Sequence, residues 1–241
     1  MGKIHVISLG GSIIIPEAID VAFLKGFREL IMDHVSRDNI DKGKGGKEKD
    51  NRIALLCGGG NINRQYVAAA RAIVPQVIDT DLDWVGIMAT RLNAELVRAL
   101  FSEHANASVV CNPTEKISFE KGKNIIVAGG WLPGWSTDYD AVMLAHQLGS
   151  TTLINLSNID YVYDKDPNSN PDAQPLPSLS WKELRELVGS VWKPRLSAPF
   201  DPIASKEAEK SGMTVIVARG TDLANLKNIL EGKPFKGTTI S

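Results

Sequence analysis

Short apolar strands that each run directly into glycines are the feature that most restricts how this chain can fold. The segments 4–9, 53–56 and 124–128 are apolar, and glycines follow them at 10–11, 58–60 and 129–130. A helical apolar pattern follows each glycine loop. This alternation predicts a parallel sheet with helices packed on it. Glycine loops at the carboxyl ends of parallel strands expose backbone N–H groups near helix N-termini, and they favour an enzyme that binds nucleotides or phosphate.

The same alternation continues to the end of the chain. We expect helices over 20–35, 62–73, 84–96, 138–149, 180–189, 201–212 and 222–231, and further strands over 107–111, 151–156, 213–218 and 238–240. The segment 157–167 is expected to form a turn and a short hairpin, and 168–177 a proline-rich loop. The predicted fold class is therefore α/β, a three-layer αβα sandwich around a mainly parallel sheet, built as one domain over 1–241.

Two of the predicted helices have clear start signals. Ser180 and Glu183 form a capping box, in which each side chain satisfies a backbone N–H of the other residue. Asp201 followed by Pro202 marks another helix N-terminus, because proline fits the first helical position. The helix of the capping box is interpreted as structural.

Composition excludes several classes of protein. The chain has 241 residues and 43% hydrophobic content, enough for a proper core, and its 27 basic and 28 acidic residues give a formal charge of −1, which argues against a nucleic-acid partner. Cys57 and Cys111 are interpreted as buried free thiols, and the four histidines lack metal-ligand spacing. No segment has the length of a membrane span, so a soluble cytoplasmic protein with no membrane partner is expected.

Three features of the sequence each allow two interpretations. Arg64 is either a solvated surface charge or a bidentate ligand for the anion that the second glycine loop faces. Asp83 is either the N-cap of the helix that follows or a ligand for a ribose hydroxyl. The segment 41–50 contains no apolar residue, and a solvated connection is favoured over a phosphate-binding loop.

Seven motifs then occur in a fixed order along the whole chain. They are GGS (10–12), GGGNxxR (58–64), DxxGIMATRLNA (83–94), GG…PGxSTDxDA (129–141), SNxDxVYDKDP (157–167), FDPxASK (200–206) and KGTTI (236–240). Together they resemble the amino-acid kinase superfamily, and within it the archaeal-type branch of UMP kinases. Each motif is loose by itself, whereas their joint order is specific.

The resemblance implies a homohexameric enzyme on the amino-acid kinase (carbamate kinase-like) fold. It would transfer the γ-phosphoryl of Mg-ATP to UMP, giving UDP and ADP in pyrimidine nucleotide biosynthesis. The implied cofactors are ATP and Mg²⁺, with no metal ligand supplied by the protein. An acceptor-binding lobe over 1–150 and an ATP-binding lobe over 151–241 would share one sheet.

The resemblance also assigns roles to individual residues. UMP would be bound by Gly58, Gly59, Gly60, Arg64, Asp83, Gly130 and Thr137. ATP would be bound by Gly10, Gly11, Ser12, Asn158, Tyr163 and Asp166. Lys206 would neutralise the transferring group, and Asp138 would organise the catalytic lysines. Phosphoryl transfer depends on positioning and positive charge, so this set of residue types suits the chemistry.

The sequence departs from the family pattern in its first strand and in the loop 129–136, which the resemblance places against the uridine and which is called the acceptor loop below. Many relatives carry a lysine in the first strand just before the first glycine loop, where this chain reads Val6-Ile7-Ser8-Leu9. Either another cation, Arg195 or the metal, supplies that charge, or the protein is a poor catalyst. Trp131 and Trp135 are either base-stacking residues or packing residues of the loop. Neither the sequence nor the resemblance decides between these two roles.

Two alternative functions stay open at this point. A superfamily kinase for carbamate, acetylglutamate or isopentenyl phosphate would share the ATP half, although Arg64 and Asp83 favour a nucleotide acceptor. A non-catalytic homologue that stores molybdate or tungstate is the second alternative. A panel of acceptors separates all three functions.

Overall fold

The structure is a computed structural model that describes residues 3–36, 51–167, 169–188 and 199–241. The segment 41–50, Gly189 and Arg195, about which the sequence raised expectations, lie outside these residues. Within the described residues no helix is long and apolar enough to cross a membrane.

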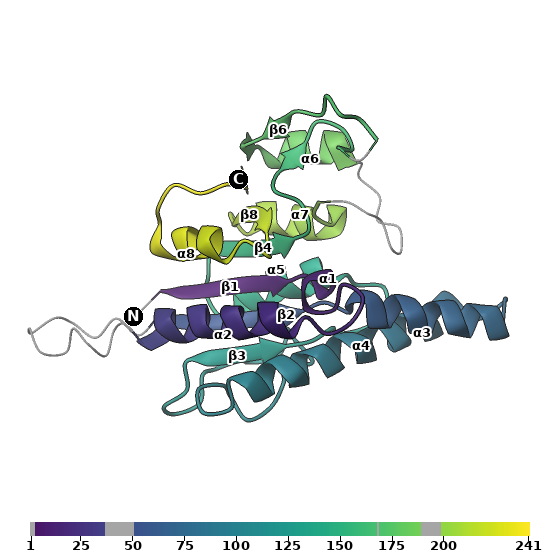
Figure 1. Cartoon of the computed structure of the whole chain (residues 1–241), viewed down its shortest axis with the longest axis horizontal. Coiled ribbons are helices and arrows are strands. Elements are labelled where there is room, and N and C mark those ends of the chain that lie inside the picture. Colours follow the sequence, from purple (N-terminus) through teal and green to yellow (C-terminus); the bar gives the residue numbers. More distant parts are fainter. Residues whose placement is uncertain (1–2, 37–50, 168, 189–198) are drawn as a thin grey trace, which may run out of the picture.

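One seven-stranded sheet forms the middle of the molecule (Figure 1). The strand order is β3-β2-β1-β4-β8-β9-β7, and among these neighbours only β8 and β9 are antiparallel. Its strands are β1 (Ile4–Leu9), β2 (Arg52–Cys57), β3 (Ile125–Ala128), β4 (Thr152–Ser157), β7 (Ser178–Leu179), β8 (Thr214–Arg219) and β9 (Thr238–Ile240). The mainly parallel sheet predicted from the sequence is confirmed.

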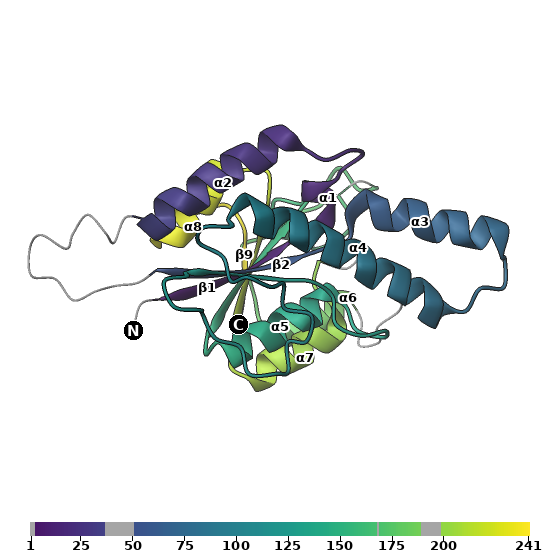
Figure 2. The same cartoon turned by 90° about the horizontal axis from the view of Figure 1, so that it is seen from below.

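Helices cover both faces of this sheet, which gives the predicted three layers (Figure 2). One face packs against α1 (Gly11–Ile14), α2 (Val21–Ser36), α4 (Asp79–Leu100) and α8 (Leu223–Glu231). The other packs against α5 (Thr137–Gln147), α6 (Trp181–Val188) and α7 (Pro202–Lys210). The central strands alternate between two buried apolar faces, as β1 illustrates with Ile7 in the first core and Val6 in the second.

The remaining helix, α3 (Gly60–Ile73), packs on α4 and extends with it away from the sheet (Figure 2). Both predicted helix starts are confirmed. Ser180 N–H donates to Glu183 Oε2 at 2.7 Å while Ser180 Oγ accepts from Glu183 N–H, and Asp201 Oδ1 accepts from the N–H of Ile203 and Ala204.

Several local predictions were wrong. The segment 107–111 is not a strand: Val110 makes an isolated bridge to Ala128, because its backbone follows β3 for only one residue pair. The segment 157–167 does not form a hairpin by itself. Its strand β5 (Val162–Tyr163) runs antiparallel to β6 (Pro175–Leu176), which lies in the segment expected to be a proline-rich loop. Cys57 is buried as expected, but Cys111 is only half-buried because no strand encloses it.

The direction in which successive strands are added to the sheet reverses at β1 and β4. From β1 the chain moves outward through β2 and β3, and then returns to the other side of β1 for β4 and β8. In open parallel sheets such a reversal leaves a crevice outside the carboxyl ends of the strands, which is where ligands bind. The loops that begin at Gly10 and at Ser157 meet at this point, since Gly10 N–H donates to Leu156 O.

Candidate active site

A cleft of about 310 Å³ lies beside this crevice, at the carboxyl ends of β2 and β3. The N-termini of α5 and α7 and one face of α4 complete its walls. Five of the residues assigned from the sequence line it, namely Gly59, Asp83, Gly130, Thr137 and Asp138. The structure therefore gathers residues from three separate motifs around one cavity.

The first two glycine loops touch each other, and this contact requires glycine. A Cβ atom on Gly11 would lie 2.0 Å from the Gly60 backbone nitrogen, and one on Gly58 would lie 2.5 Å from the Gly11 nitrogen. Gly60 also has φ = +63°, a conformation that side chains disfavour. These glycines bring the backbone of β1 and the N-terminus of α3 together, which forms a glycine cradle of the kind that suits phosphate.

Arg64 lies across the two loops. Its Nη1 donates to Ser12 Oγ at 3.2 Å and its Nη2 to Pro16 O at 3.4 Å, although it starts from the first turns of α3. The side chain is exposed. An exposed guanidinium beside a glycine cradle is placed to bind an anion there, so the structure favours the ligand interpretation over a solvated surface charge.

Two buried residues of α4 that were not assigned to the site hold its glycine loops in place. Asn93 donates to the carbonyl oxygens of Gly58 (2.7 Å) and Gly59 (3.1 Å). Thr90 Oγ1 accepts from Gly130 N–H at 2.7 Å. Both lie within the motif DxxGIMATRLNA, but the sequence does not reveal which residues of a helix face a loop.

Arg91 and Asp140 fix the acceptor loop after Gly130. Arg91 donates from Nε to Gly130 O and from Nη2 to Trp131 O, both at 3.0 Å. Asp140 Oδ2 accepts from Trp131 N–H, also at 3.0 Å. The loop is therefore held from α4 and from α5 at consecutive residues, and sequence reasoning missed both contributions.

Asp83 lies on the cleft wall and is not a helix cap. The helix α4 begins at Asp79, one turn earlier than expected, and Ile78 is the residue that precedes it. Asp83 therefore lies within α4, where Oδ2 accepts from Gly134 N–H at 3.1 Å. The N-cap interpretation is wrong because the helix starts before Asp83.

Asp138 and Asp140 share a strongly perturbed environment. Burial raises the pKa of Asp138 to about 7, against the opposing effect of a hydrogen bond from Asp201 N–H at 3.0 Å. Burial likewise raises the pKa of Asp140 to about 7, against the Trp131 N–H and the nearby charge of Arg91. Oδ1 of Asp140 is buried and has no hydrogen-bond partner. Buried carboxyls with raised pKa values are typical of functional sites.

The aromatic side chains of the acceptor loop stack on one another. Trp135 lies 4.1 Å from the ring of Tyr139 and 6.2 Å from the ring of Trp131, measured between centroids, and all three rings are nearly parallel. Trp135 also lines the cleft. The stacking favours a packing role for Trp131, whereas Trp135, which also faces the cleft, fits both roles.

The residues assigned to ATP lie at the crevice and beyond it. Gly10 is the N-cap of α1, and Gly11 and Ser12 are its first two residues. Asn158 follows β4, with its Oδ1 accepting from Ser157 Oγ at 3.4 Å. Tyr163 lies in β5, and Asp166 begins the next turn, where its carbonyl accepts from Asn170 N–H. Lys206 is exposed on α7, about one turn beyond Asp201, which lines the cleft.

The described residues contain no group of three or more histidine, cysteine, aspartate or glutamate side chains that could hold a metal ion. The donor set at the crevice, made of backbone amides and hydroxyls, fits phosphate oxygens. A magnesium ion at this place would arrive coordinated by those phosphates.

Comparisons with known proteins agree in family and fold. The model of the amino acid kinase family matches residues 3–219. Uridylate kinase from Thermoplasma volcanium is 35% identical over 241 residues, covering 100% of this chain and 98% of that protein. Uridylate kinase from Pyrococcus abyssi is 33% identical, covering 98% of each. The crystal structure of uridylate kinase from Archaeoglobus fulgidus superposes with a TM-score of 0.80 at 30% identity, covering 99% of this chain and 100% of that one.

Proposed function

This chain belongs to the amino acid kinase family, and from that premise we propose that it is a UMP kinase, which transfers the γ-phosphoryl of ATP to UMP and forms UDP and ADP. The step belongs to pyrimidine nucleotide biosynthesis. Full-length similarity to proteins named uridylate kinase supports the proposal.

One observation at the site itself supports the proposal. Arg64 lies across two glycine loops that touch each other, directly beside a cleft that is large enough for a nucleoside. An acceptor phosphate fits the Arg64 end, where the helix dipole of α3 also favours an anion. The remainder of the acceptor then extends into the cleft toward Asp83, Gly130 and Thr137.

The donor occupies the crevice at the strand reversal. Gly10, Gly11 and Ser12 surround its phosphates, and Asn158, Tyr163 and Asp166 contact the nucleotide beyond them. Mg²⁺ neutralises phosphate charge when it is bound with ATP. No general base is required, because the acceptor is already an anionic phosphate.

Positive charge near the transferring group comes from Lys206 and Arg64 in this proposal. Ser8, at the position of the missing lysine, is buried in β1. The bond from Arg64 to Ser12 supports Arg64 as the cation beside the first glycine loop, in place of that lysine. In this proposal Asp138, on the cleft wall at the N-terminus of α5, organises the catalytic lysines, among them Lys206.

We also propose that the enzyme is a cytoplasmic homohexamer with an acceptor-binding lobe over 1–150 and an ATP-binding lobe over 151–241, in which the glycine loop 10–12 of the first lobe also contacts the ATP phosphates. Exposed apolar side chains on α3 and α4 support association: Tyr66 is 63% exposed, Met88 57% and Leu92 58%. They border two apolar grooves of about 360 and 460 Å³. Patches of this kind on a folded domain are typical of protein interfaces.

The test is an ADP-release assay with Mg-ATP against UMP, CMP, dCMP, carbamate, acetylglutamate and isopentenyl phosphate at matched concentrations. Preference for UMP is the expected result. Preference for another acceptor would change the proposed substrate and leave the proposed ATP site unchanged. No turnover on any acceptor would refute the proposal and favour a storage protein, for which oxyanion clusters inside the assembled particle are the diagnostic observation.

A further inference from the structure

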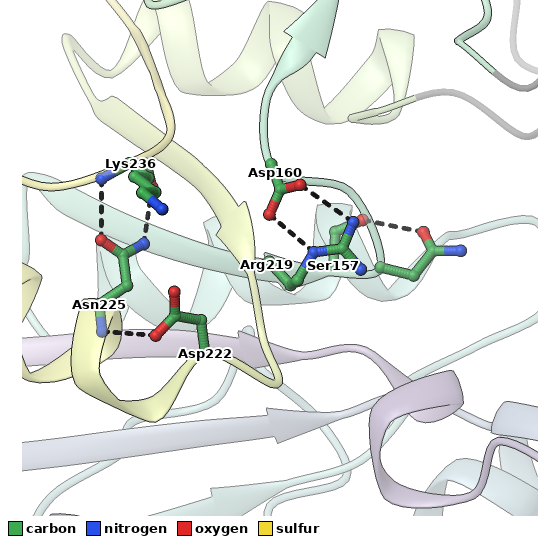
Figure 3. A network of polar contacts seen from close by, with 7 residues as sticks. Ser157, Asp160, Arg219, Asp222, Asn225 and Lys236 are labelled. Atoms are coloured by element: carbon green, nitrogen blue, oxygen red, sulfur yellow. Dashed lines mark hydrogen bonds and ion pairs between the residues drawn. The ribbon is translucent and has the colours of Figure 1, made fainter.

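A two-point ion pair joins the end of β8 to the loop that follows β4 (Figure 3). Arg219 donates from Nε to Asp160 Oδ1 at 2.7 Å and from Nη2 to Asp160 Oδ2 at 3.2 Å. Both side chains are 42% exposed. An exposed pair contributes little to folding, so its geometry calls for another explanation.

Asp160 lies in the middle of the loop 157–163, and Arg219 lies on the neighbouring strand β8. Arg219 is in register with Ser157 on the neighbouring strand, and Gly220 N–H donates to Ser157 O at 2.8 Å. At the other end of the loop, Val162 N–H donates to Thr238 Oγ1 at 2.8 Å. Between these two anchors, Asp160 supplies the side-chain contact that fixes the middle of the loop.

The same loop carries two of the residues proposed for the donor nucleotide. Asn158 lies two residues before Asp160, and Tyr163 three residues after it. The pKa of Arg219 is raised, first by the hydrogen bond to Asp160 and to a smaller extent by Tyr163. Arg219 is therefore coupled to this loop through Asp160.

A second cation faces the same carboxylate. The pKa of Asp160 is lowered, mainly by the hydrogen bond from Arg219, with a smaller effect of Lys236. The backbone of Lys236 is held by the buried side chain of Asn225, which donates to Lys236 O at 2.6 Å and accepts from Lys236 N–H at 2.8 Å (Figure 3). The C-terminal segment thus adds to the positive environment of Asp160.

From these contacts we propose that Arg219 is a positioning residue for the donor nucleotide: by pairing with Asp160 it holds the loop 157–163 in the conformation that presents Asn158 and Tyr163 to ATP. This inference rests on the proposed function, in which that loop contacts ATP. Arg219 acts through the loop and does not take part in the transfer step.

The test compares Arg219→Met, Asp160→Asn and the double variant. An exposed ion pair limits the expected effect, so KM for ATP should rise about two- to fivefold in each single variant. KM for UMP and kcat should stay at their wild-type values. Because both substitutions break the same contact, the double variant should lose no more than Arg219→Met alone.

Arg71→Met is the matched control. Arg71 pairs with Asp79 at 2.6 Å, with side-chain exposures of 41% and 63%, but the pair joins α3 to α4 outside the donor crevice. Removing it should leave KM for ATP unchanged. Arg219→Lys should retain part of the wild-type affinity, because lysine keeps the charge and loses the two-point geometry.

Binding of a non-hydrolysable Mg-ATP analogue, measured by calorimetry without acceptor, separates this inference from the proposed function. If the wild type binds the analogue but turns over no UMP, the Kd values of the two single variants and the double variant for the analogue still decide the role of Arg219. Additive losses in the double variant, equal losses for ATP and UMP, or no loss at all would overturn it. A wild-type protein that binds no analogue would overturn both.

Discussion

Replacement of Asp140 by asparagine should stabilise the protein at alkaline pH. The carboxyl lies buried at the N-terminal end of α5, one of its oxygens has no hydrogen-bond partner, and burial raises its pKa from 3.8 to about 7. Between these two values the folded protein binds more protons than the unfolded chain, so stability falls as pH rises. Asparagine keeps an oxygen that can accept from Trp131 N–H and removes the ionisation.

The magnitude follows from the shift in pKa. A rise of about 3 units, at 1.36 kcal/mol per unit, corresponds to an upper limit of about 4 kcal/mol above pH 7. Asp138 titrates in the same range beside Asp140, so part of the effect belongs to the pair. We therefore expect Asp140→Asn to be more stable than the wild type by about 2–4 kcal/mol at pH 8, with a difference below about 1 kcal/mol at pH 4.

Urea unfolding at fixed protein concentration, measured at pH 4 and pH 8 for both proteins, checks this expectation. Asp160→Asn is the control of opposite sign, because its pKa is lowered by Arg219 and its charge therefore adds stability at pH 8 that is lost as pH falls. Parallel pH profiles of the wild type and Asp140→Asn would refute the argument, since they would mean that Asp140 ionises as readily in the folded protein as in the unfolded chain.

Three further outcomes are expected. Lys206→Ala should lower kcat by about a hundredfold or more with little change in either KM, because its charge acts in the transition state; a change confined to KM in steady-state assays would contradict that role. Arg64→Ala should raise KM for UMP at least about tenfold and also lower kcat, because Arg64 supplies charge beside the transferring group, and it should leave KM for ATP nearly unchanged; equal changes in the two KM values would mean that Arg64 does not bind the acceptor phosphate. In the native protein one thiol per chain should react with a thiol reagent, because burial raises the pKa of Cys57 to about 12 while Cys111 is partly exposed; mass mapping that finds label on Cys57 would contradict this.

The architecture could be predicted from local pattern alone. Strands such as β1 are buried on both faces by helices, so they are continuous apolar runs that end at glycines, and this signal survives in the sequence. Helix starts were equally readable where a cap and its partner lie within three residues, as at Ser180 and Asp201. The prediction failed at 107–111 because β-branched residues there follow the sheet edge without forming a ladder.

Part of the candidate site was readable for the same reason. The glycines at 10–11, 58–60 and 129–130 lie at strand ends, and their surroundings now give the physical cause. Another backbone lies too close for a Cβ atom at Gly10, Gly11, Gly58 and Gly60, whereas helix side chains leave no ordinary room for one at Gly59, Gly129 and Gly130. The sequence left two interpretations of Arg64 open. Its contact with Ser12, 52 residues away along the chain, is a fact of the fold.

Only the tertiary structure decided which residues distant in sequence contact one another. Thr90, Arg91 and Asn93 occur in a helix without any local sign of a role, yet they hold the backbone of loops that begin at residues 58 and 130. The raised pKa of Asp140 has the same origin, because burial depends on which elements enclose a side chain. By itself the sequence determined the layers, the strand ends and the glycine loops, since these follow from local periodicity and backbone sterics. The support around the site was decided by how α4, α5 and α7 pack together, which no local pattern encodes.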